Sequence, residues 1–149
     1  MKTSISKSVA GGIIGTAAMS IEMYLASMMG MPKMSPPDKL VGMLSIPLIA
    51  AWLMHFTIGI TYAMAYTHLF APKVKISNIY LKGAVFGFAA FVFAQIAIAT
   101  MEALFQPAQM EGTIIQLMIG SIIGHIVFGI GVSKTIGHAL CTDKAIEKT

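Results

Sequence analysis

The sequence predicts an all-α membrane protein, a bundle of four transmembrane helices. Of its 149 residues, 56% are hydrophobic and only 11% are charged, whereas soluble domains carry about 25% charged residues. Four apolar stretches each exceed the ~20 residues that a helix needs to cross a bilayer. Because backbone polar groups in lipid must be satisfied within the chain, these stretches are expected to be helices. The length indicates one integral membrane domain, residues 1–149.

The four expected spans cover residues 7–31, 46–70, 78–104 and 112–137. Prolines follow the first three spans: Pro32, Pro72 and Pro107. Pro47 opens the second span, where its missing N–H costs nothing. Ser77 or Asn78 is placed to cap the third, and Glu111 lies at the start of the fourth. Residues 38–44 predict a short helix on the membrane surface.

Lysine placement predicts the orientation of the spans. The chain contains no arginine, and eight of its ten lysines fall on one side of the bundle: Lys2, Lys7, Lys73, Lys75, Lys82, Lys134, Lys144 and Lys148. The other side has only Lys33 and Lys39. By the positive-inside rule both termini are expected in the cytoplasm. The lysines lie outside the apolar runs and are not patterned for nucleic acid.

An internal repeat relates the two halves of the chain. His55 precedes Gly59, and His125 precedes Gly129, by the same four residues. Paired glycines in the first and third spans are Gly11, Gly15, Gly83 and Gly87. Such small-xxx-small spacing predicts close helix packing, and we expect it to bring the first and third spans together. The pattern indicates two tandem helical hairpins related by a pseudo-twofold axis along the membrane normal.

Four polar residues are expected at similar depth within the spans. At 1.5 Å per residue, Glu22 and His55 lie about 22 Å from the cytoplasmic ends, His125 about 19 Å and Gln95 about 25 Å. When Gly11 is aligned with Gly83, Glu22 falls one residue from Gln95. Polar side chains inside a membrane are costly and generally face the bundle interior. The sequence therefore predicts one buried polar layer.

Three interpretations of this layer remain open. Glu22 and a histidine would fix helix register by hydrogen bonding. Alternatively, His55 and His125 would be the axial ligands of a b-type haem. In the third interpretation, Glu22, His55 and His125 would bind a metal ion or relay protons. A second haem is disfavoured because His68 and His138 follow by thirteen residues, a rotation of about 220°, unless a π-bulge intervenes.

The chain also contains thirteen methionines. Met19 and Met23 lie one turn apart beside Glu22, and more methionines follow at the outer end of the first span. Thioethers bind Cu(I), but methionine is also a flexible apolar filler of helix interfaces. The sequence favours the second interpretation.

Several segments together resemble a family of small four-span bacterial membrane proteins of unknown function. They are the glycine-rich run 11–19, Met28-Met-Gly-Met-Pro-Lys-Met34, Trp52-x-x-His55-Phe-x-x-Gly59, Gly83-x-x-x-Gly87 and Gly124-His125-x-x-x-Gly129. Ser35 stands where that family often has an acidic residue. The resemblance covers nearly the whole chain and implies four helices in a bacterial inner membrane, without implying an activity.

The function expected from the sequence is that of a small non-enzymatic accessory subunit, packed in the bilayer against other membrane subunits or copies of itself. So little of the chain lies outside the expected spans that helix faces and short loops are its main means of contact. The first alternative is a haem b electron carrier using His55 and His125. The second is metal or proton translocation through Glu22, His55 and His125. Motifs of hydrolases and nucleotide-binding proteins are absent from the sequence.

Overall fold

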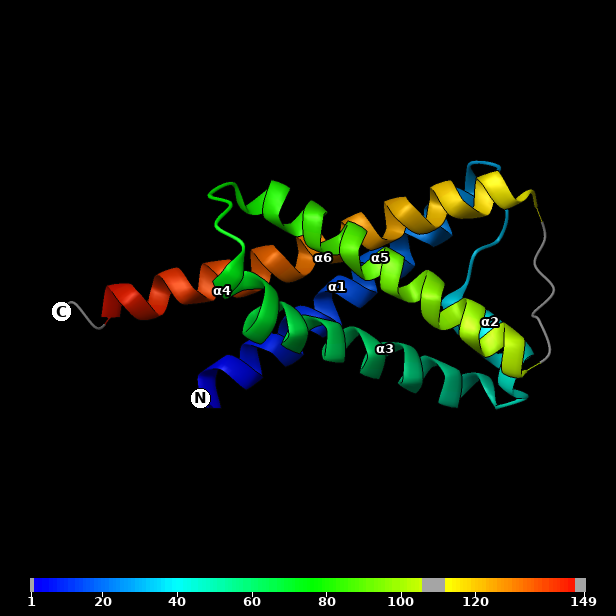
Figure 1. Ribbon diagram of the computed structural model, residues 1–149, viewed down its shortest axis with the longest axis horizontal. Helices are drawn as coiled ribbons and strands as arrows, with labels where there is room; N and C mark the ends of the chain where they lie inside the picture. Colours follow the sequence, from blue (N-terminus) through cyan, green and yellow to red (C-terminus); the bar gives the residue numbers. More distant parts are fainter. Residues whose placement is uncertain (1, 106–111, 147–149) are drawn as a thin grey trace.

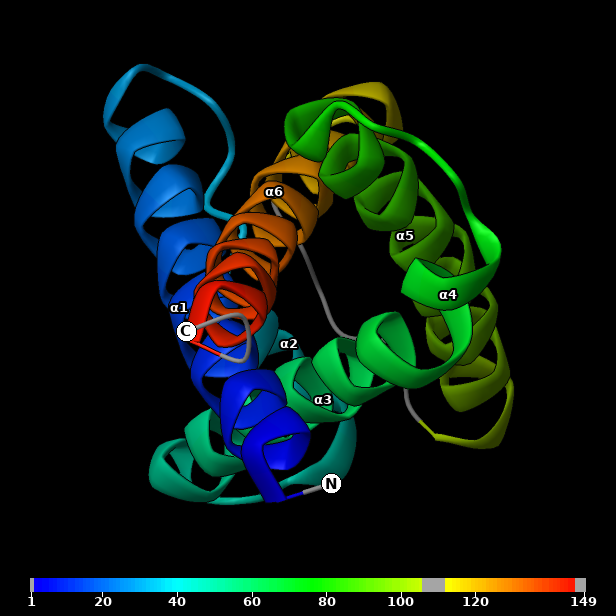
Figure 2. The same ribbon diagram turned by 90° about the vertical axis from the view of Figure 1, so that its left-hand side faces the viewer.

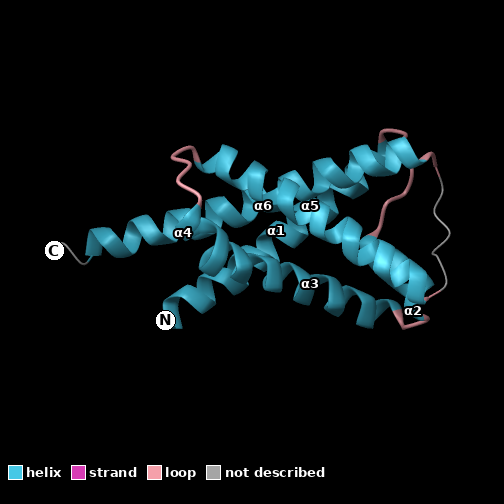
Figure 3. Ribbon diagram, viewed as in Figure 1, coloured by secondary structure: helices cyan, strands magenta, loops and turns pink. Residues whose placement is uncertain are grey.

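The computed structural model describes residues 2–105 and 112–146, with side chains described for 5–105 and 112–137. Within these residues every regular element is a helix (Figures 1 and 3). The long helices are α1 (Lys2–Met28), α3 (Leu48–Ala65), α5 (Ile79–Leu104) and α6 (Ile114–Ile146). The short ones are α2 (Pro36–Leu44), the π-helical η1 (Tyr66–Phe70) and α4 (Ala71–Lys73).

Four candidate membrane spans confirm the predicted bundle. They are Ile5–Met28, Leu48–Lys73, Ile79–Leu104 and Ile114–Gly137, each long and apolar enough to cross a bilayer. We call the two ends of the bundle the α2 end and the η1 end. The start of α1 and the end of α6 both lie at the η1 end, and α3 and α6 run in the same direction (Figure 1).

Local sequence signals explain most helix boundaries. Asn78 caps α5 as expected, because its Oδ1 accepts hydrogen bonds from the N–H groups of Tyr80 and Leu81 at 2.9 and 3.1 Å. The first helix ends at Met28, before the expected Met31, and Gly30 follows with a φ of 93°, a left-handed conformation that glycine favours. Gln106, Pro107 and Glu111 lie outside the described residues.

The second span continues further than the proline signal suggested. Its helix passes from α3 through η1 into α4 and ends at Lys73, with Pro72 near the start of α4. The π-helical turn contains His68.

The short helix α2 begins two residues before its predicted start. Ser35 is its N-cap, and the Ser35 Oγ accepts a hydrogen bond from the Asp38 N–H at 3.3 Å. The helix ends where Ser45 adopts a φ of 53°. It buries Pro37 and Met43 and packs against α3, so it is more than a surface helix.

Glycines let helix backbones approach each other in both halves of the bundle. A Cβ atom on Gly83 would lie 2.7 Å from the Gly129 oxygen, and one on Gly12 would lie 3.0 Å from the Gly59 oxygen. The hairpins α1–α3 and α5–α6 therefore repeat the same contact. The contact pairs Gly12 with Gly83, one residue away from the alignment used for the sequence repeat.

The halves meet along one interface. A Cβ atom on Gly15 would lie 2.9 Å from the Phe128 oxygen, which shows how closely α1 approaches α6. The order of packed helices is α3, α1, α6, α5, so the glycines do not join α1 directly to α5 as expected. In the described part of the chain, α3 and α5 are not closely packed, and Figure 2 shows them on separate sides of the bundle. The two hairpins repeat the same internal contact, but the two interfaces between them are unequal.

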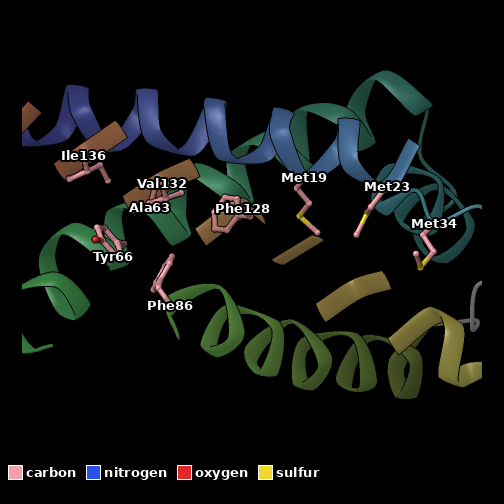
Figure 4. Packing of buried hydrophobic residues seen from close by; sticks show 9 residues of the cluster. All are labelled: Met19, Met23, Met34, Ala63, Tyr66, Phe86, Phe128, Val132 and Ile136. Carbon is pink, nitrogen blue, oxygen red and sulfur yellow. The ribbon is translucent and has the colours of Figure 1, made fainter. Parts of the chain in front are cut away.

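A hydrogen-bonded aromatic cluster closes the bundle at the η1 end (Figure 4). The rings of Tyr66 and Phe86 meet edge to face, with centroids 4.9 Å apart. The Tyr66 hydroxyl lies 2.7 Å from the Ser133 Oγ, which itself donates to the Ile79 oxygen at 3.0 Å. Since the single Ser133 proton is used there, Tyr66 is the donor to Ser133. Polar atoms are thus satisfied inside an apolar core that includes Val132.

We predict that Gly83→Val destabilises the bundle by about 1–3 kcal/mol, because the added side chain collides with the α6 backbone. The melting temperature of the purified protein in detergent measures the effect. Ala99→Val, on an exposed face of the same helix, is the matched control. Equal melting temperatures for the two variants would contradict the close α5–α6 packing.

Candidate functional site

A cavity of about 630 Å³ occupies the half of the bundle nearer the α2 end. Side chains of α1, α2, α3, α5 and α6 line it. Tyr62 and Phe128 lie toward the η1 end, which we call the deep end of the cavity, and Leu40 and Met43 of α2 lie toward the α2 end, which we call its mouth. It lies on the side where α3 and α5 fail to pack. Its size is within the ~300–1,000 Å³ range of small-molecule and cofactor sites.

Two histidines from opposite helices line this cavity. His55 comes from α3 and His125 from α6, and these two helices are not packed against each other, because α1 lies between them in the packing order. Gln95 of α5 lines the same cavity, so the structure gathers three of the four residues of the predicted polar layer.

The imidazole of His125 has a fixed orientation. Its Nδ1 lies 2.7 Å from the Ser121 oxygen one turn earlier. Because a carbonyl oxygen only accepts, Nδ1 carries the proton, and Nε2 of the neutral ring is left with its lone pair. The edge of Phe91 supports the ring, with centroids 5.8 Å apart. Such an N–H to carbonyl bond is how proteins orient histidines that ligate metals.

Ser121 and Gln95 extend the polar wall beside His125. The Gln95 side-chain amide donates to the Ser121 Oγ at 3.3 Å, linking α5 to α6 within the cavity. Sequence reasoning missed Ser121, although its position one helical turn before His125 places it on the same face.

His55 is held less firmly. Its side chain is 8% exposed and packs against Trp52 and Phe56. Its Nε2 lies 3.4 Å from the Ser20 Oγ, a long contact, and the Ser20 hydroxyl already donates to the Thr16 oxygen at 2.9 Å. Rotation of the His55 ring into the cavity would therefore break only one weak hydrogen bond.

Thr16 lies beside the cavity, but its hydroxyl is buried in the α1–α3 contact. The residue is 1% exposed, and its Oγ1 has no hydrogen-bond partner among the described residues. This hydroxyl occupies the space that a Cβ on Gly59 would need. It therefore contributes to helix packing and is not available to a guest.

Glu22 is separated from the other members of the predicted layer. It does not line the cavity; its Oε2 lies 3.3 Å from the position of a Cβ on Gly124, in the α1–α6 contact. The described residues contain no group of three His, Cys, Asp or Glu side chains able to hold a metal ion. Glu22, His55 and His125 are thus not gathered as three ligands of one ion.

The mouth of the cavity carries its charged groups. Lys39 of α2 and Glu102 of α5 both line it, and the Lys39 Nζ lies 3.0 Å from the Glu102 Oε1. Methionines cover much of the remaining wall: Met19, Met23, Met34, Met43, Met101 and Met118. Thioethers adapt to the shape of an apolar guest.

The second pair of histidines is not part of this site. His68 is exposed and does not line the cavity, even though a π-helical turn does occur at its position. The side chain of His138 lies outside the described residues.

The fold and the cavity define a class: a four-helix, multi-pass membrane protein with an internal polar site. The model of a family of unknown function, DUF6789, matches residues 2–144. The chain belongs to that family. No curated protein and no solved structure matches it.

We predict that Ser121→Cys reacts quickly with N-ethylmaleimide, because the cavity admits a small reagent, in a background where the single Cys141 is replaced by serine. Val132→Cys, at a core position that is 0% exposed, should react at least about tenfold more slowly, because its thiol is reached only when the core opens. Mass spectrometry of the intact protein measures both rates. Equal rates would show that the cavity is closed to solutes.

Proposed function

We propose that this protein is a b-type haem electron carrier of the membrane, with His55 and His125 as the two axial ligands. The observation that carries the proposal is that two imidazoles from parallel, opposite helices line one cavity. Haem supplies one-electron redox chemistry, and its axial ligands tune the potential.

The donor atoms suit this ligand set. His125 presents the Nε2 lone pair because its Nδ1–H is bound to the Ser121 oxygen. His55 Nε2 donates to Ser20, whose own proton goes to the Thr16 oxygen, so His55 becomes a ligand once this long contact is released and the ring proton moves to Nδ1. The methionine-rich wall around the histidines offers the adaptable apolar surface that a flat macrocycle needs.

The cavity supports a ligand-binding role beside the packing role. Its volume of about 630 Å³ and its polar groups are of the kind that small-molecule and cofactor sites have. A carrier with this little extramembrane chain must still exchange electrons with other proteins. The accessory role and the haem site are therefore proposed together, as a haem-bearing subunit of a larger membrane assembly.

Copper binding is the second candidate, favoured by a specific observation. Six methionines and two histidines line the same cavity, and thioethers together with imidazoles suit Cu(I). This set replaces the three-residue set of Glu22, His55 and His125 as the metal-ion candidate.

The lysine distribution supports an orientation with both termini in the cytoplasm. Lys7, Lys73, Lys75 and Lys134 belong to the η1 end or its flanking segments, whereas Lys39 is at the α2 end. The positive-inside rule then places the α2 end on the opposite face of the membrane. The family resemblance supports a bacterial inner membrane as the location.

We predict that protein purified after expression with haem available shows a Soret band and a reduced α-band. His55→Ala and His125→Ala each abolish both bands, because one axial ligand is lost. His68→Ala keeps them; this is the matched control, an exposed histidine on the continuation of the same span. Absorption spectra of the oxidised and reduced protein provide the measurement.

A colourless sample would refute the haem proposal. Copper analysis of the same sample then tests the second candidate: copper bound to the wild type and lost in His125→Ala would support it, and a metal-free protein would remove it.

We predict that the protein co-purifies with other integral membrane proteins from its native membrane in mild detergent. Chemical cross-linking before solubilisation identifies the contacts. A monodisperse free monomer in both experiments would contradict the subunit role without affecting the spectral test.

A further inference from the structure

The charges of the cavity are confined to its mouth. Among the described residues that line it, only Lys39 and Glu102 carry a full charge, and they are paired with each other at 3.0 Å. Both side chains retain some exposure, 20% for Lys39 and 37% for Glu102. The cavity therefore has a deep end with coordinating groups and a mouth with one exchangeable ion pair.

The mouth lies at a defined height above the histidines. Glu102 follows Gln95 by seven residues on α5, so both lie on the same helix face about 10 Å apart along the axis. Gln95 marks the level of His125 through their shared neighbour Ser121. If a macrocycle were held between the histidines, carboxylate groups at its edge would lie at the level of Glu102.

The position of Lys39 is fixed by the fold of α2. Ser35 caps the helix, and Pro37 and Met43 are buried beneath it. Met34, just before the helix, is buried against α6, where its methyl group occupies the space that a side chain on Gly120 would need. Lys33, in the same segment, is exposed and does not line the cavity. Of the two lysines in this segment, only Lys39 lines the cavity.

We infer that Lys39 is the counter-ion of the haem propionates, and that Glu102 is the partner it releases when haem binds; this inference rests on the proposed function. The propionate edge then faces the α2 end, away from the chain termini. Exchange of one carboxylate partner for another keeps the lysine neutralised in both states. In the absence of haem, the ion pair with Glu102 keeps the Lys39 side chain at the mouth of the cavity.

A comparison of haem with its dimethyl ester tests the inference, because the ester keeps the ring and iron but lacks the carboxylate charges. Dissociation rates are measured by transfer to apomyoglobin for the wild type, Lys39→Ala, Glu102→Gln and the control Lys33→Ala. In the wild type and in Lys33→Ala, haem should dissociate roughly tenfold more slowly than the ester, the size expected for one charge-assisted contact. Lys39→Ala should reduce this ratio to about one. Glu102→Gln, which frees the lysine, should keep the ratio or increase it.

The ratio separates the specific contact from any loss of folding. A variant that is merely unstable releases both ligands faster and keeps the ratio. An unchanged ratio in Lys39→Ala would overturn the role of Lys39 while leaving the haem proposal intact. Failure of the wild type to bind either ligand would overturn the haem proposal itself, and the inference with it.

Discussion

The close approach of helix backbones at glycine positions determines the rest of this structure. Where Gly83 meets Gly129 and Gly12 meets Gly59, side chains would separate the helices, and their absence lets main-chain atoms come into contact. In lipid, such packing replaces the hydrophobic effect as the main force joining helices. Both hairpins depend on it, and so does the α1–α6 contact at Gly15.

The same constraint explains why a cavity exists. Glycine contacts draw the four spans together in the order α3, α1, α6, α5. The remaining pair, α3 and α5, faces across the bundle with the bulky residues Ile58 and Ile98 and the polar His55 and Gln95 in the cavity wall instead of a glycine contact. A twofold-symmetric bundle would close both interfaces between hairpins. This bundle closes one, and the polar groups gather beside the other.

Much of the fold follows from the sequence because lipid leaves few alternatives to a helix. The apolar runs predict the four spans, and Asn78 predicts the start of α5. Depth along a helix also follows from residue counting, which is why His55, Gln95 and His125 share a cavity. The direction in which a side chain points depends on its rotation about the helix axis, which depth alone does not give. Thr16, Met19 and Met23 form one face of α1, and Glu22 is rotated from it by roughly 90°, so its depth is similar but it does not line the cavity.

Other features depend on contacts that no local pattern encodes. The volume of the cavity results from the separation of α3 and α5 and is invisible in either helix alone. The π-helical turn at Tyr66–Phe70 contains no proline or glycine from which it could have been predicted. The pairing of Lys39 with Glu102 joins residues 63 positions apart and requires α2 to lie over the mouth, which its packing on α3 determines.

The two ends of the bundle differ in how strongly α5 is held to its neighbours. At the η1 end, Phe86 of α5 packs against both Tyr66 and Phe70, and the Lys82 Nζ donates to the Ala71 oxygen at 2.9 Å. Separating these elements would expose aromatic surface and break hydrogen bonds, at a cost of several kcal/mol. At the α2 end, the described tie between α2 and α5 is one partly exposed ion pair, and such pairs contribute about 0–1 kcal/mol. The ion pair between α2 and α5 is therefore easier to break than the aromatic contacts at the η1 end. A guest that carries its own carboxylates, as proposed above, would restore at Lys39 the interaction that its binding breaks.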